Sequence, residues 1–283
     1  MKIKEILFQG VSILKEYNIE DSNMKARIIL ADLLEKNKEY LIIHSEDEVK
    51  DEICRVFLKN IERLKKQEPL QYIINKQEFM GFEFYVDNNV LIPQPDTEIL
   101  VEEVISLAEK LKNDIKEEIK ILDLCTGSGA IAISLSRLVG NSIVSASDIS
   151  EAALKIAKEN AIKNQANIVF FESDLFDKIS NKDKFDIIVS NPPYIETDII
   201  KDLSEEVRKE PILALDGGID GLYFYRKIIK NAKEYLNENG YLAFEIGYNQ
   251  RVEVEKIFKE CGYKNIYSKK DLSKNDRIVV GQV

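Results

Sequence analysis

The apolar positions of this 283-residue chain follow a helical period at first and a strand period later. Over residues 2–67 they recur three or four apart, as in Ile28, Ile29 and Leu33, and glycine and proline are almost absent. Residues at that spacing share one face of a helix, so the segment predicts a small helical bundle. Asp21 and Ser22 predict the N-terminal cap of the second helix.

From residue 68 the pattern changes. Residues 69–74 and 81–86 are apolar, partly alternating runs, which predict the two strands of a hairpin or a strand-containing linker. Residues 90–98 then form a proline-rich loop that opens a helix to about residue 111. Prolines beside acids and an amide favour a wall of an active site, whereas a plain linker with Asp96 as helix cap explains the same residues.

Strands and helices alternate through the rest of the chain. The predicted strands cover residues 120–124, 142–147, 168–171, a run that ends at Asn191, 241–246 and two short runs in the tail. The predicted helices cover residues 130–138, 151–164, 222–236 and 251–259. This alternation predicts an α/β domain with a parallel sheet and right-handed crossovers.

Composition narrows the class of protein. The length favours two domains, and 45% hydrophobic with 32% charged residues is usual for a soluble globular protein. A net charge of −10 argues against sequence-blind nucleic-acid binding. Three scattered cysteines and one histidine, His44, fit reduced thiols and no metal cluster. Without an 18-residue apolar run or a signal-peptide pattern, we expect a cytoplasmic protein that does not bind membranes.

One basic cluster lies on a predicted helix of the N-terminal segment. Its members fall largely on one side of that helix: Arg55, Lys59, Arg63, Lys65 and Lys66. Such a cluster is either a docking face for a macromolecular partner or an ordinary solvated face.

The strand that ends at Asn191 carries the most informative motif, Asn191-Pro192-Pro193-Tyr194. Two prolines stop the strand and stiffen the turn, because they lack N–H groups and fix φ. In open α/β sheets, ligands bind at the carboxyl ends of the strands. The Asn191 side-chain oxygen and the Pro192 carbonyl can each accept one hydrogen of a planar NH2 group, and Tyr194 offers it a flat face. The alternative is an ordinary Pro-Pro turn.

A second motif lies between an earlier strand and its helix. Cys125, Thr126, Gly127, Ser128 and Gly129 follow Asp123 at the end of a buried strand. Glycines there let a ligand approach the backbone at a helix start. The spacing also matches the dinucleotide fingerprint, but the Asp123 carboxylate would repel a pyrophosphate and suits the ammonium and sulfonium of S-adenosylmethionine.

Asp148 ends the next strand, about 20 residues beyond the glycine loop. This spacing places its carboxylate to accept hydrogen bonds from both ribose hydroxyls of a nucleoside cofactor. Ile149 and Leu175 are candidates to pack against the adenine ring. The alternative for Asp148 is a helix N-cap, with Ser150 as a competing cap.

With both motifs in view, the chain resembles the HemK/PrmC family, the peptide chain release factor N5-glutamine methyltransferases. The segments that carry the resemblance are 68–72, 78–81, 91–93, 97–98, 123–132, 173–176, 189–195, 210–211, 214–218, 220–222, 245–247, 270–273 and 275–277. Three positions depart from it: the family commonly has Arg and Glu where Gln94 and Asp96 stand, and Gly at Cys125. We expect Cys125 to be tolerated if its φ is negative.

The resemblance implies a Rossmann-like, seven-stranded methyltransferase domain that uses S-adenosyl-L-methionine. It implies a helical domain over residues 1–70 that docks on release factors, a β-hairpin linker over 71–92 and the catalytic domain over 93–283. It places the substrate glutamine at residues 191–194 and the cofactor at residues 125–129, Asp148, Leu175 and Asn191. We add Asp123, Ile149 and Asp174 to the cofactor set.

The resulting hypothesis is methyl transfer to the glutamine of the Gly-Gly-Gln tip of class I release factors. We keep open an adenine-N6 DNA or RNA methyltransferase, which shares the NH2-binding turn but must flip its base and present a basic surface. A cofactor-binding regulator or a nicotinamide enzyme is the third possibility.

Overall fold

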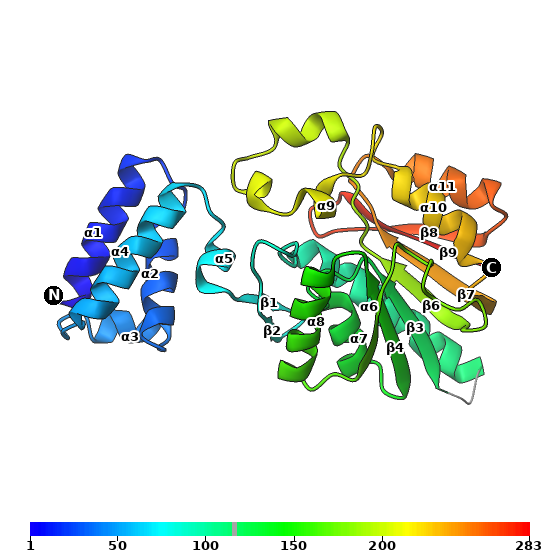
Figure 1. The fold of residues 1–283 in the computed structure, drawn as a ribbon, viewed down its shortest axis with the longest axis horizontal. Coiled ribbons are helices and arrows are strands. Elements are labelled where there is room, and N and C mark those ends of the chain that lie inside the picture. Colours follow the sequence, from blue (N-terminus) through cyan, green and yellow to red (C-terminus); the bar gives the residue numbers. More distant parts are fainter. Residues whose placement is uncertain (115–117) are drawn as a thin grey trace. The chain divides into compact units, whose positions relative to one another are not determined.

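The computed structural model describes residues 1–114 and 118–283, and these fold into two compact units (Figure 1). The first unit comprises residues 1–76 together with residues 204–209. The second comprises residues 77–203 and 210–283. No helix in the described part of the chain is long and apolar enough to cross a membrane.

The first unit is the predicted helical bundle. Its helices are α1 (Ile3–Glu16), α2 (Ser22–Leu33), α3 (Lys38–Ile43), α4 (Asp51–Lys65) and α5 (Leu70–Ile74). Ile6, Ile29 and Phe57 are fully buried among them, as the helical spacing requires. Asp21 occupies the N-cap position of α2, but its side chain makes no capping hydrogen bond, so the predicted cap is wrong in its chemistry.

The predicted hairpin is displaced along the chain. Residues 70–74 form helix α5 rather than a strand, because Leu70 and Ile73, three apart, bury their side chains in the core of the helical bundle. The hairpin consists of β1 (Gln77–Phe79) and β2 (Phe82–Phe84), paired antiparallel. The strand prediction for residues 69–74 is therefore wrong.

The second unit is a seven-stranded sheet flanked by helices, which confirms the predicted fold class. Its strands are β3 (Ile119–Leu124), β4 (Ser142–Asp148), β5 (Ile168–Glu172), β6 (Phe185–Ser190), β7 (Leu236–Glu245), β8 (Lys264–Lys270) and β9 (Asp276–Gln282). The order is β5-β4-β3-β6-β7-β9-β8. The first five are mutually parallel, and β9 runs antiparallel to both of its neighbours, so the sheet is mixed rather than all parallel.

Helices cover the sheet on both faces. The helices of this unit are α6 (Glu98–Asp114), α7 (Ala130–Leu138), α8 (Glu151–Lys163), α9 (Ile212–Leu215), α10 (Tyr223–Ala232) and α11 (Arg251–Glu260), with 3-10 turns η1 (Pro95–Thr97) and η2 (Thr197–Asp202). The 3-10 turn η3 (Val207–Lys209) belongs to the first unit. On β3, Leu122 and Leu124 join one core cluster with α10 and α11, whereas the alternate residues face the side that α6 and α7 cover.

The strand order places the site. The chain starts the sheet at β3, builds outwards through β4 and β5, and then returns to the other side of β3 with β6. Such a reversal leaves a crevice beyond the carboxyl ends of the two central strands, which is where ligands bind in open α/β sheets. The glycine loop follows β3, and Asn191 follows β6.

Candidate active site

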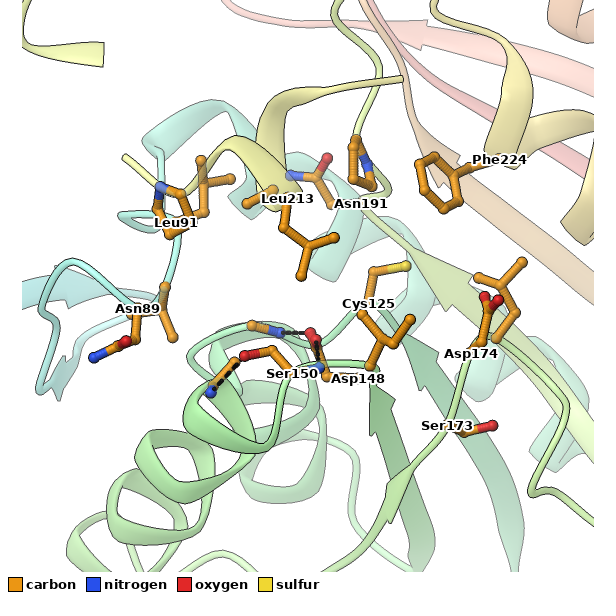
Figure 2. Close-up of a pocket in the computed structure, with 18 of the residues that line it drawn as sticks. Asn89, Leu91, Cys125, Asp148, Ser150, Ser173, Asp174, Asn191, Leu213 and Phe224 are labelled. Carbon is orange, nitrogen blue, oxygen red and sulfur yellow. Dashed lines mark hydrogen bonds between the residues drawn. The ribbon is translucent and has the colours of Figure 1, made fainter. Parts of the chain in front are cut away.

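A cavity of about 320 Å³ opens at the carboxyl ends of β3, β4, β5 and β6 (Figure 2). It brings together the two motifs that the sequence singled out, since Gly127 and Asn191 both line it. In Figure 2, Asn191 and Asp148 lie on opposite sides of the cavity, with Cys125 and Leu213 between them. A ligand in the cavity therefore touches the glycine loop at one end and the Asn-Pro-Pro-Tyr turn at the other.

The glycine loop has left-handed backbone at three positions. Cys125, Gly127 and Gly129 have φ values of +58°, +55° and +83°. The condition under which we expected Cys125 to be tolerated, a negative φ, is therefore not met. Cys125 has a left-handed conformation that glycine adopts without strain and that other residues adopt at a cost. The Cys125 side chain lines the cavity, and burial together with the nearby carboxylates of Asp148 and Asp123 raises the pKa of its thiol far above the usual range.

Asp148 fixes the loop from the neighbouring strand. Its Oδ2 accepts from the Gly127 N–H at 2.8 Å, and its Oδ1 accepts from the Ser150 N–H at 2.9 Å. The N-cap of α8 is Ser150, whose Oγ accepts from the Ala153 N–H at 3.1 Å, so the interpretation of Asp148 as the cap is wrong. An ionised carboxylate can accept more hydrogen bonds than these two, and Asp148 lines the cavity. Burial raises the pKa of this carboxyl group.

Asp123 lies fully buried and is not among the residues that line the cavity. Its Oδ2 accepts from the Thr126 hydroxyl at 2.6 Å, while Oδ1 has no partner in the described part of the chain. Burial raises its pKa to about 7. The carboxylate thus supports the loop and leaves one buried oxygen uncompensated.

Asn191 is held by a residue from the proline-rich loop. Its Nδ2 donates to Thr97 Oγ1 at 3.3 Å, and the Thr97 hydroxyl donates to Glu245 Oε2 at 2.5 Å. The Tyr194 hydroxyl reaches the other oxygen of the same carboxylate at 3.4 Å. Glu245, at the end of β7, is buried, and this burial raises its pKa to about 7. Both polar residues of the turn are therefore tied to one carboxylate.

The main chain of the turn is held from its other side. Gln250 Nε2 donates to the Tyr194 carbonyl oxygen at 2.9 Å, and Gln250 Oε1 accepts from the Gly247 N–H at 3.0 Å. Gly217 approaches the turn so closely that an added Cβ would lie 2.7 Å from the Tyr194 Cα. Pro192 and Pro193 are buried. In the described chain no hydrogen bond reaches the Pro192 carbonyl or Asn191 Oδ1.

The loop of residues 90–98 combines two roles. Val90 and Leu91 line the cavity, whereas Asp96 forms an ion pair with Arg277 at 3.0 Å. Asp96 lies inside the 3-10 turn η1 and caps no helix, so that alternative is wrong. Arg277 also pairs with Asp271 at 2.9 Å, which fastens the loop to β9 and the tail.

Comparison with known proteins shows which family this chain belongs to. Residues 5–74 match the PrmC N-terminal domain, and residues 104–210 match the methyltransferase small domain. The chain is 39% identical over 283 residues to a release factor glutamine methyltransferase of Clostridium botulinum, covering 99% of this chain and 98% of that one. It is 41% identical to one of Clostridium acetobutylicum at the same coverage. The chain belongs to the release factor glutamine methyltransferase family.

A solved structure agrees on the fold. The hMettl16 catalytic domain in complex with MAT2A 3′UTR hairpin 1 is 14% identical, with a TM-score of 0.58 over 89% of this chain and 90% of that chain. At such low identity the likeness shows the methyltransferase fold alone. Within residues 1–114 and 118–283, no group of three or more His, Cys, Asp or Glu residues is arranged to hold a metal ion.

The cavity of this methyltransferase family member contains most of the residues proposed from the sequence. Those that line it are Cys125, Gly127, Asp148, Ile149, Asp174, Leu175, Asn191 and Pro193. Those that do not line it are Asp123, Thr126, Ser128, Gly129, Pro192 and Tyr194. Their roles toward cofactor and substrate remain proposals.

Sequence reasoning did not assign several residues of this cavity. Leu213 follows the Glu210-Pro211 pair, and Phe224 lies in the first turn of α10, both far along the chain from the two motifs. Thr97 and Glu245 also went without a role, although both fall in segments that carried the family resemblance. That resemblance was the only available signal, because neither residue belongs to a local motif whose chemistry is evident.

Proposed function

We propose that this protein transfers a methyl group from S-adenosyl-L-methionine to the side-chain nitrogen (N5) of the glutamine in the Gly-Gly-Gln motif of class I peptide chain release factors. The observation that carries the proposal is that Asn191 lines the same cavity as Gly127 and Asp148. An acceptor for an NH2 group thus lies beside a pocket suited to a nucleoside. The full-length similarity to proteins named release factor glutamine methyltransferases supports this substrate.

The residues around the cavity fit S-adenosylmethionine. Asp148 keeps lone pairs for two ribose hydroxyls while the Gly127 and Ser150 N–H groups hold it in place. Ile149 and Leu175 supply apolar surface for a purine ring. Asp123, just before the loop, has an unpartnered buried oxygen, and a cationic ligand in the cavity would favour the ionised form of that carboxyl group. S-adenosylmethionine supplies a methyl group on a positively charged sulfur.

The turn after β6 supplies the substrate side of the reaction. Asn191 Oδ1 and the Pro192 carbonyl oxygen accept the two hydrogens of the glutamine NH2 group, and Tyr194 gives the amide a flat surface. Two acceptors favour the pyramidal nitrogen whose lone pair points at the methyl group. Catalysis then rests on positioning and hydrogen bonding, with no dedicated base, because the amide nitrogen becomes strongly acidic once methylated.

The helical first unit matches the PrmC N-terminal domain, and we assign docking on the release factor to it. In its basic cluster, Arg63 and Lys65 are already paired, with Glu68 and Glu62, each at 2.6 Å.

Incubation with labelled S-adenosylmethionine and a purified release factor tests the function. We expect label on the wild-type release factor and none on a variant whose tip glutamine is alanine. A titration with NAD in place of S-adenosylmethionine should show no binding. Equal labelling of the two release factors would remove the tip glutamine as the acceptor, and methylation of adenine in DNA or RNA would replace the proposal with the nucleic-acid enzyme.

A further inference from the structure

A single buried carboxylate controls the side chains of the turn. Glu245 accepts from the Thr97 hydroxyl at 2.5 Å and from the Tyr194 hydroxyl at 3.4 Å. Thr97 Oγ1 in turn accepts from Asn191 Nδ2 at 3.3 Å. These four residues come from η1, from the loop after β6 and from the end of β7, so the chain of hydrogen bonds exists only in the folded domain.

The direction of each hydrogen bond follows from the chemistry of these groups. An ionised carboxylate can only accept hydrogen bonds, so the Thr97 hydroxyl must be the donor in its hydrogen bond with Glu245. The Thr97 oxygen can then only accept a hydrogen bond from Asn191. The Asn191 side chain must donate this bond through its NH2 group, because its carbonyl oxygen cannot donate. The Asn191 carbonyl oxygen is therefore the amide atom left for a substrate.

We propose that Glu245 is a positioning residue that acts through Thr97 to fix the orientation of the Asn191 amide, and that this orientation selects a substrate NH2 group over a carboxylate. The proposal rests on the proposed function, because it assumes that Asn191 meets the substrate amide. Were the Asn191 amide reversed, its NH2 group would face the substrate NH2 group and the site would favour a carboxylate instead.

The surroundings of Glu245 serve this role. The positive charge of Arg277 lowers the pKa of Glu245 and the negative charge of Asp96 raises it, while the hydrogen bond from the Tyr194 hydroxyl also lowers it. The Arg277–Asp96 ion pair at 3.0 Å also holds the 3-10 turn that carries Thr97. Tyr225 donates to the main-chain oxygen of Glu245 at 3.0 Å, which holds the backbone and leaves both carboxylate oxygens to Thr97 and Tyr194.

The test uses three variants of the full chain. Thr97→Val keeps the shape of the side chain but removes the hydroxyl, and Thr97→Ser retains it. Tyr263→Phe is the control, because it removes a buried hydrogen bond to the Ile229 main-chain oxygen that involves none of these residues. The measurements are kcat, the KM for S-adenosylmethionine, and inhibition by a release factor whose tip glutamine is replaced by glutamate.

For Thr97→Val we expect kcat to fall roughly 10- to 100-fold, the equivalent of losing one hydrogen bond in a chain that ends at a charged group. The KM for S-adenosylmethionine should stay within about twofold of wild type, because the glycine loop and Asp148 are untouched. Inhibition by the glutamate-tipped release factor should strengthen relative to binding of the glutamine-tipped one, by roughly tenfold. Thr97→Ser should restore kcat to within about threefold of wild type, and Tyr263→Phe should leave the selectivity unchanged.

A Glu245→Gln variant gives an independent result. Burial raises the pKa of Glu245 to about 7, so wild-type kcat should rise with pH through about 7 as the carboxylate ionises and fixes the Thr97 proton. The variant, which cannot ionise, should lose that step. Loss of the pH-dependent rise of kcat in Glu245→Gln would support the proposal even if Thr97→Val folds poorly.

Two outcomes overturn the proposal. One is a Thr97→Val enzyme that keeps wild-type kcat and selectivity, and the other is a Thr97→Val enzyme that loses activity toward both tips in parallel and is not rescued by Thr97→Ser. Neither outcome bears on the proposed function, which stands or falls on methylation of the glutamine tip by the wild-type protein.

Discussion

The N–H of Gly127 donates to Oδ2 of Asp148 at 2.8 Å, which joins the loop after β3 to the end of β4. One carboxylate thus holds a loop residue of left-handed backbone and also lines the cavity. Because Asp148 has this structural role as well as the proposed ribose-binding role, its substitution must be compared with that of an acid that has a structural role only.

Replacing Asp148 with alanine should weaken binding of S-adenosylmethionine by about 1.5–3 kcal/mol, since a charged acceptor for the ribose hydroxyls is lost. Isothermal titration calorimetry measures this directly. Asp186→Ala is the matched control, because Asp186 is a buried acid on β6 that accepts from the Lys120 N–H at 2.8 Å and from Asn237 at 2.7 Å but does not line the cavity. It should lose stability and keep the affinity. Unchanged affinity in Asp148→Ala would refute the ribose assignment.

Removing the amide of Asn191 should lower turnover by roughly 10²–10³, the usual effect of deleting one preorganised polar contact to the reacting group. Single-turnover methylation of the release factor measures it. Asn164→Ala serves as control, since the Asn164 amide donates to the Glu83 and Asn160 main-chain oxygens, and Asn164 does not line the cavity. Near-normal turnover of Asn191→Ala would take the NH2-binding turn out of the mechanism.

A methyl group at Gly221 should disturb the turn from behind. An added Cβ would collide with the Tyr194 oxygen and lie 2.6 Å from Gln250 Nε2, at a φ of +67°. Because Tyr194 must move, we expect Gly221→Ala to lower kcat by roughly 10²-fold. Gly81→Ala isolates the backbone strain, since Gly81 has a φ of +76° with nothing within 4 Å of the added Cβ. If both variants lose stability equally and both keep kcat, the close contact at Gly221 has no role in catalysis.

The buried acids of the site should make stability fall as pH rises. Burial raises the pKa of Asp123 from 3.8 and that of Glu245 from 4.5, both to about 7. The protonated form therefore favours the fold: the contribution is fully present below about pH 4 and is lost as pH rises through 7. For Glu245 it is on the order of 3 kcal/mol.

Urea denaturation at pH 5.5 and pH 8.5 measures this dependence. We expect the wild-type protein to be less stable at the higher pH, and Glu245→Gln to show a smaller difference between the two. An identical difference in both proteins would mean that Glu245 does not titrate in this range. The predicted rise of kcat over the same interval runs in the opposite direction, since catalysis uses the ionised form that folding disfavours.

Some features could be predicted from the sequence because they depend on neighbouring residues alone. The glycine loop and the Asn191-Pro192-Pro193-Tyr194 turn each depend on the backbone limits of their own residues, and alternating strands and helices imply the α/β class. Local signals failed where packing overrode them. Residues 70–74 are a short, mostly apolar run that resembles a strand, yet they form α5 because Leu70 and Ile73 complete the core of the helical bundle.

The sequence by itself determined the fold class, the family and the identity of the two motifs. Each of these follows from local patterns, which are short runs of neighbouring residues that can be recognised without knowing how the chain folds. Only the tertiary structure decided how the motifs are held. Thr97 and Glu245 are 148 residues apart, and their hydrogen bond forms because η1 and the end of β7 meet beside the turn after β6. The left-handed φ of Cys125 was decided in the same way, since the loop is closed by Asp148 from another strand. A periodic pattern predicts which face of a helix or strand is buried, but it does not predict which distant side chain will contact that face.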